Sequence, residues 1–85
     1  MDTQINEKKM RWRCRRGIRE LDVLFGEFLN TEFAQLAMPE KQAFVRLLEV
    51  QDPTIMDWLF SRSSPDDAGV LAIIGKLQVQ SGIAG

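Results

Sequence analysis

Three observations predict a small all-α protein, a five-helix bundle. Apolar residues recur at helical spacing along most of the 85 residues. Proline and capping residues divide the chain into segments of helix length. No segment carries a convincing strand pattern. A chain of this length forms one domain, which we expect over residues 1–78, with residues 79–85 as a flexible tail.

The first two helices are predicted on either side of Gly17. Residues 5–16 form a basic helix that turns Ile5, Trp12 and Cys14 toward the core. The next helix extends to Phe33 or Leu36. Its stripe of apolar residues, typical of an amphipathic helix, is Ile18, Leu21, Leu24, Phe25, Phe28 and Leu29. Periodicity does not decide whether the chain bends at Gly17 or runs through it as helix.

The last three helices are predicted from their starting signals. Pro39 suits the first position of a helix, and Asp52 followed by Pro53 suits an N-cap and a first position. Ser64 is expected to cap the last helix, with Asp66–Asp67 in its first turn. The apolar residues expected on the buried faces are Phe44, Leu47, Leu48, Ile55, Trp58, Leu59, Val70, Leu71, Ile74 and Leu77.

Residue types that are absent exclude most catalytic chemistry. The chain has no histidine and a single cysteine, Cys14. A Ser-His-Asp triad, a Cys-His pair and a structural zinc site therefore cannot form. Cys14 is expected to be a small buried residue without an internal disulfide partner, which suits a reducing compartment. We expect neither an enzyme nor a metal protein.

Charge is divided unevenly along the chain. Residues 8–19 hold seven of the eleven bases, whereas residues 20–85 carry ten acids and four bases. Apolar runs are far shorter than the roughly 20 residues that a membrane span needs. The basic segment is not followed by an apolar stretch, so we expect no secretory signal. Such a segment suits steering toward an acidic partner surface, although a basic stretch is often only a solvated face.

The segment Arg15-Arg16-Gly17-x-x-Glu20 is the candidate docking surface. In a continuous helix Arg16 and Glu20 would lie one turn apart, and Gly17 would let another backbone approach closely. Arg16 could then bind a partner carboxylate through two hydrogen bonds. The alternatives are a bend at Gly17 and an exposed ion pair of little energetic consequence. The residues predicted to bind a partner are Arg16, Gly17, Glu20, Arg15, Asp22, Arg13 and Lys9.

This segment and the motifs that follow it resemble the SdhE family of succinate dehydrogenase FAD assembly factors. The later motifs are Leu21-Asp22, Phe44-x-x-Leu47-Leu48-Glu49, Asp52 and Trp58-Leu59. The chain departs from the family pattern at Thr54-Ile55 and at Phe60-Ser61, where the family often has a glycine.

The resemblance implies a cytoplasmic bacterial assembly chaperone with five helices. It would bind the flavoprotein subunit of succinate dehydrogenase, and in a number of family members that of fumarate reductase, and promote covalent attachment of FAD; which of the two this chain serves stays open. FAD would be handled on the partner, and this chain would bind no cofactor stably.

Two other functions stay open. The same family also carries the antitoxin name CptB, which implies a protein-interaction module with another partner. Residues 8–19 could also serve as a recognition helix for nucleic acid. A net charge of −1 and a sequence pI of about 5.3 disfavour nucleic-acid binding.

Overall fold

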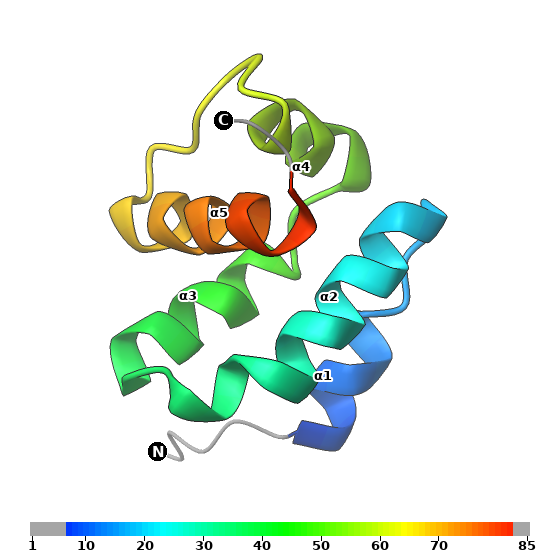
Figure 1. Cartoon of the computed structure of the whole chain (residues 1–85), viewed down its shortest axis with the longest axis vertical. Coiled ribbons are helices and arrows are strands. Elements are labelled where there is room, and N and C mark those ends of the chain that lie inside the picture. The colour runs from blue at the N-terminus through cyan, green and yellow to red at the C-terminus, as the bar shows by residue number, and fades with distance from the viewer. Residues whose placement is uncertain (1–6, 83–85) are drawn as a thin grey trace.

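The computed structural model describes residues 7–82, and the predicted core residue Ile5 lies outside them. The predicted five-helix all-α bundle is confirmed within this range, where no strand occurs. The elements are α1 (Glu7–Arg13), α2 (Arg19–Thr31), a 3-10 helix η1 (Phe33–Gln35), α3 (Met38–Leu47), α4 (Asp52–Leu59) and α5 (Ala68–Ser81). Figure 1 shows α5 between α3 and α4, with α1 and α2 together at one side.

The core is built around α5, which packs against α2, α3 and α4. Phe44 of α3 lies at the centre of an aromatic cluster, with its ring centroid 5.0 Å from Phe28, 5.6 Å from Phe33 and 5.9 Å from Phe25. No polar or charged residue is buried among residues 7–82. The stability of the bundle therefore rests on apolar burial, at about 25 cal/mol per Å² of apolar surface removed from water.

Helix α1 attaches to this core through Met10 and Cys14, both almost fully buried. Cys14 follows the helix directly and still donates a backbone hydrogen bond to the Met10 carbonyl at 3.0 Å. The prediction that Trp12 is a core residue is wrong, because its side chain is 72% exposed. Residues two positions apart lie about 200° apart around a helix, so a face that buries residues 10 and 14 turns residue 12 outward. Trp58 is half-buried and packs against the core.

The chain bends between α1 and α2. Residues 14–18 are not helical, and α2 begins at Arg19 with Ile18 as its N-cap in an extended conformation. The bend at Gly17, one of the two alternatives, is therefore the one adopted. Arg16 and Glu20 consequently do not share a continuous helix.

Helix α4 starts one residue earlier than predicted. Gln51 is its N-cap and Asp52 is its first helical residue. The Asp52 carboxylate bonds to Arg16 and Ile18 across the fold, and no side-chain hydrogen bond caps this helix. The cap assigned to Asp52 is therefore wrong, whereas Pro53 and Pro39 do lie in the first turns of their helices.

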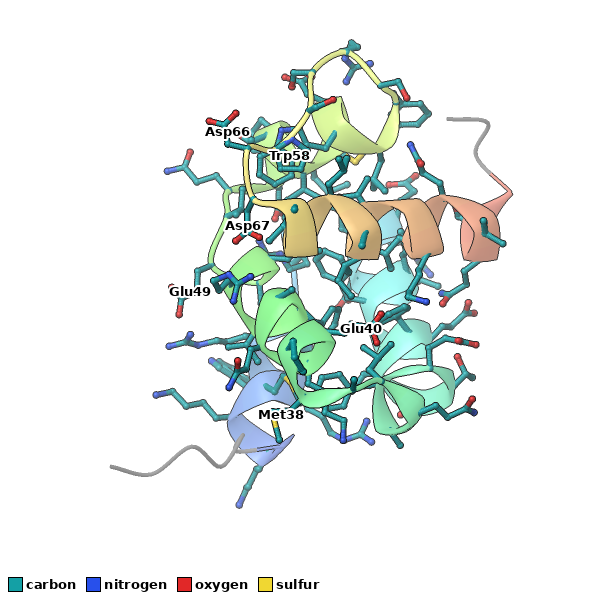
Figure 2. The ribbon with its side chains drawn as sticks, turned by 90° about the vertical axis from the view of Figure 1, so that its left-hand side faces the viewer. Met38, Glu40, Glu49, Trp58, Asp66 and Asp67 are labelled. Atoms are coloured by element: carbon teal, nitrogen blue, oxygen red, sulfur yellow. The ribbon has the colours of Figure 1, made fainter. Side chains whose placement is uncertain are left out.

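The N-cap of α5 is Asp67, and the prediction of Ser64 is wrong. The Asp67 carboxylate accepts hydrogen bonds from the backbone N–H groups of Gly69 and Val70, at 2.9 and 3.2 Å. It also pairs with Arg46 of α3, and Figure 2 shows Asp67 at the start of α5 close to α3.

This later start also corrects the buried face of α5. Leu71 is 47% exposed and Ile73 is buried instead, beside Val70, Ile74 and Leu77. The helix runs to Ser81, beyond the boundary predicted at residue 78. Gln78 and Gln80 donate side-chain hydrogen bonds to the carbonyls of Leu59 and Leu24. No helix within residues 7–82 is long and apolar enough to cross a membrane.

Candidate functional site

Arg16 lies at the centre of the predicted docking segment, but its side chain points into the molecule. Its Nε donates to Asp52 Oδ1 at 2.8 Å, and its terminal nitrogens donate to the carbonyls of Arg13, Leu48 and Val50. These bonds use four of the five N–H donors of a guanidinium. The guanidinium carbon also lies 5.5 Å from the ring centre of Phe25. The free, bidentate fork expected from the sequence is therefore not the arrangement that Arg16 adopts.

The Arg16–Asp52 pair joins two connections of the fold. Asp52 Oδ2 accepts from the backbone N–H of Ile18 at 3.3 Å, and the Leu48 and Val50 carbonyls belong to the α3–α4 connection. The two side chains are only 10% and 18% exposed. A nearly buried ion pair with its remaining hydrogen bonds satisfied is costly to break from one side. The pair therefore fixes the conformation of residues 14–18 against α3 and α4.

Gly17 is held by this arrangement at the surface of the molecule. A Cβ atom built on it would meet Asp52 Oδ2 at 3.8 Å, an ordinary van der Waals distance. Its φ angle is not in the left-handed region that favours glycine. Nothing in the fold of this chain therefore requires glycine at position 17.

Arg15 and Trp12 form an exposed stack beside Gly17. The Arg15 guanidinium lies 6.0 Å from the centre of the Trp12 ring. Both side chains line two shallow hollows. Lys8, Lys9 and Arg11 complete the first hollow. Arg13, Arg16, Leu48 and Glu49 complete the second. Figure 2 shows the Glu49 side chain projecting outward beyond the end of α3.

Glu20 is exposed and lies at a different hollow. With its neighbour Arg19 it lines an apolar groove between α2, α4 and the end of α5, whose lining also includes Val23, Met56 and Phe60. No ion pair among residues 7–82 joins Glu20 to Arg16. The structure therefore does not bring these two motif residues together.

The remaining predicted site residues lie around this segment. Arg13 pairs with Glu49 at 2.9 Å on the surface, where such a pair stabilises little. Lys9 is exposed on α1. Asp22 lies in the first turn of α2, where its charge suits the helix dipole, and the ion pairs of residues 7–82 do not include it. Partner binding by these residues stays a prediction.

Cys14 is confirmed as a buried residue. Burial raises the pKa of its thiol to about 11, and Asp22 adds to the rise while Arg16 and Arg11 oppose it. The thiol is therefore protonated at neutral pH and is a weak nucleophile. No cluster of three or more acidic, histidine or cysteine side chains that could hold a metal ion occurs among residues 7–82.

Sequence reasoning missed two features of this site. Asp52-Pro53 resembled a helix cap, so the role of Asp52 as the partner of Arg16 had no local signal. Trp12 was assigned to the core because large aromatics usually fill small bundles. The spacing of Met10 and Cys14 was the available signal that Trp12 faces outward.

Comparison with known proteins places the whole bundle in one family. Residues 8–81 match the family described as the flavinator of succinate dehydrogenase. Proteins named FAD assembly factor SdhE from Yersinia pestis and from Yersinia pseudotuberculosis are each 40% identical over 73 residues, covering 86% of this chain and 83% of the relative. The protein of the same name from Coxiella burnetii is 40% identical over 78 residues, covering 92% and 95%. The chain therefore belongs to the succinate dehydrogenase flavinator family, the SdhE family.

Proposed function

We propose that this chain is an assembly chaperone that binds the flavoprotein subunit of succinate dehydrogenase, and of fumarate reductase, and promotes covalent attachment of FAD to it. Membership of the family over residues 8–81 supports this function. The location of the binding surface is inferred from one observation: Gly17 is exposed, and the fold of this chain does not require a glycine there.

The physical argument concerns how closely a partner can approach. Glycine lets the backbone of another protein lie against its own backbone without a side chain between them. The Arg16–Asp52 pair holds Gly17 in one conformation before binding, so little ordering entropy is lost when the partner arrives. Arg16 therefore acts by positioning the surface, and the exposed neighbours Arg15 and Glu20 remain available to the partner.

The chemistry takes place on the partner. An imidazole nitrogen of the flavoprotein would bond to the 8α carbon of FAD; its N–H proton and one hydrogen of the 8α methyl group would be displaced, and their electron pair would reduce the oxidised flavin ring. This chain has no histidine to contribute. Its role is to stabilise the flavoprotein conformation that aligns these two atoms. It acts in the bacterial cytoplasm, holds no cofactor of its own and is not an enzyme.

The test measures covalent flavin on the succinate dehydrogenase flavoprotein in cells with and without this chain. Fluorescence of the denatured, electrophoresed subunit reports covalent flavin directly. We expect the band to fade without the chain, to return with the wild type, and to stay absent with Gly17→Glu. The reason is that a long side chain at position 17 obstructs close approach of the flavoprotein.

Two controls separate the effect of side-chain bulk at position 17 from the effect of its charge and from misfolding of the variant. Gly17→Gln has the same length without a charge beside Asp52, and we expect it to fail as Gly17→Glu does. Both variants should keep the far-UV circular dichroism and urea midpoint of a folded bundle. An unchanged band in cells lacking the chain would contradict the assembly function, and normal flavoprotein binding by folded Gly17→Glu would contradict the Gly17 surface.

A further inference from the structure

Trp12 is the most exposed large aromatic side chain among residues 7–82, and it contributes nothing to the buried core. The ring is 72% exposed, while Met10 and Cys14 alone anchor the same stretch to the core. A solvated tryptophan contributes little to folding, but it is a frequent hot spot of protein interfaces. An indole held by one stacked arginine is also already partly ordered before binding.

The surroundings of Trp12 indicate the chemistry of a partner. Four cationic residues, Lys8, Lys9, Arg11 and Arg15, line the hollow on one side of the ring. Arg11 is oriented by a 2.8 Å hydrogen bond from its Nη1 to Asn30 Oδ1 of α2. A complementary surface would present an apolar recess for the ring, with carboxylates around its rim.

The charges of the second hollow favour a protein partner over a polyanion such as a nucleic acid. Glu49 lines it together with Trp12 and Arg13, and the Glu49 side chain is 63% exposed. Glu49 is paired with Arg13 at 2.9 Å, so this hollow presents charges of both signs, unlike the uniformly cationic surface that typically binds a nucleic acid or an anionic membrane. A protein surface of mixed charge can accommodate both the basic hollow and Glu49. The net charge of −1 for the whole chain points the same way.

We propose that Trp12, stacked on Arg15 and ringed by Lys8, Lys9 and Arg11, is the anchor that inserts into a carboxylate-rimmed apolar recess of the flavoprotein subunit. This inference rests on the proposed function, because it takes its partner from there. It adds a second point of attachment to the Gly17 surface and assigns that attachment to a residue outside the motif.

The first experiment measures the Kd of the purified chain for the FAD-free flavoprotein subunit. Trp12→Ala should weaken binding about thirtyfold, the effect of a typical interface hot spot, and Trp12→Phe should recover most of the loss. Leu71→Ala is the control, because Leu71 is also an exposed apolar side chain, 47% accessible, and it lies on α5 outside the linings of the hollows described above. It should leave the Kd unchanged.

A second measurement observes Trp12 in the unaltered chain. The chain is labelled with 5-fluorotryptophan, which gives one ¹⁹F resonance for Trp12 and one for Trp58, assigned with Trp58→Phe. Addition of unlabelled flavoprotein should shift the Trp12 resonance and remove its sensitivity to exchange of H₂O for D₂O. The Trp58 resonance should move far less.

The outcomes separate the inference from the proposed function. A wild-type chain that does not bind the flavoprotein overturns both. A wild-type chain that binds, with an unchanged Kd for Trp12→Ala and an unmoved Trp12 resonance, overturns only the anchor. So does loss of affinity in Leu71→Ala alone, which would place the interface on α5. Binding of duplex DNA or phosphatidylserine vesicles that depends on Trp12, without an effect on flavoprotein binding, also overturns it.

Discussion

Two arginine–aspartate pairs of nearly equal bond length join different parts of this bundle. Arg16 Nε lies 2.8 Å from Asp52, and Arg46 Nε lies 2.7 Å from Asp67. The side chains of the first pair are 10% and 18% exposed, whereas those of the second are 50% and 40% exposed. Water therefore screens the second pair and hardly reaches the first.

The difference teaches that bond length alone does not rank ion pairs. The pair at α3 and α5 has the more regular contact, with a second bond from Arg46 Nη2 to Asp67 Oδ1 at 3.1 Å. If this exposed pair is broken, however, water can solvate both the guanidinium and the carboxylate. Water cannot take the place of Asp52 at Arg16 in this way, because the guanidinium is nearly buried. Its terminal nitrogens already bond to the backbone carbonyls of Arg13, Leu48 and Val50. Removal of its carboxylate leaves a nearly buried charge without a counterion.

The largest expected effect comes from Asp52→Ala. This change should lower the free energy of unfolding by about 3 kcal/mol, because it leaves Arg16 unpaired and removes the acceptor of the Ile18 N–H. Urea denaturation followed by circular dichroism measures the loss. Arg46→Ala breaks the exposed pair and leaves the Asp67 cap of α5 in place, so it should cost clearly less. Equal losses for the two variants would show that burial does not separate the pairs.

A smaller effect, of opposite sign, is expected at Ser61 in the connection that leads to Asp67. Ser61 has a φ of 60°, a left-handed conformation that glycine adopts without steric strain. Ser61→Gly should therefore raise the free energy of unfolding by about 0.5–1 kcal/mol.

Ser61→Gly also sharpens the comparison, because Ser61 belongs to neither ion pair. In the double variant Asp52→Ala/Ser61→Gly, the changes that the two substitutions cause in the urea midpoint should add. Strong non-additivity would show that the two connections are coupled. Ser61→Ala serves as the control that keeps a Cβ atom and should bring no gain.

The smallest effect is a pH dependence of the exposed pair. The hydrogen bond from Arg46 lowers the pKa of Asp67 below its ordinary value of 3.8, and the backbone N–H of Val70 adds to this. A carboxyl whose pKa is lower in the folded state stabilises the fold above the unfolded pKa. That contribution is lost as the pH falls through the folded pKa.

Asp67→Asn tests this dependence, because asparagine keeps the cap and removes the charge. Urea midpoints of the wild type and Asp67→Asn should differ by a constant amount from neutral pH to about pH 4 and converge below it. A difference that persists undiminished at pH 2–3 would contradict the assignment.

The sequence predicted most of the fold because apolar periodicity is a local signal. Phe25, Phe28, Phe44 and Leu47 were assigned to the core and lie there. The predictions were wrong where the local sequence suggested a helix cap but the side chain has another role in the fold. Asp52 precedes proline as a cap does, and Ser64 precedes proline and two acids, yet tertiary contacts with Arg16 and Arg46 selected different roles for the acids of these segments.

The candidate site was predictable in position but not in geometry. Gly17 and its basic neighbours stood out from charge and spacing. The inward turn of Arg16 depends on carbonyls more than 30 residues away along the chain, which no local pattern reveals. Trp12 was assigned by its size, although the neighbours that decide its direction are Met10 and Cys14.

The burial of Cys14 has a practical consequence. It is the only thiol of the chain, and it becomes reactive only when α1 separates from the core and the thiol pKa returns toward its ordinary value. The rate at which iodoacetamide alkylates the native protein therefore reports how often α1 opens. Cys14 is thus a built-in probe for the detachment of α1 from the core, on the face of the helix opposite to Trp12.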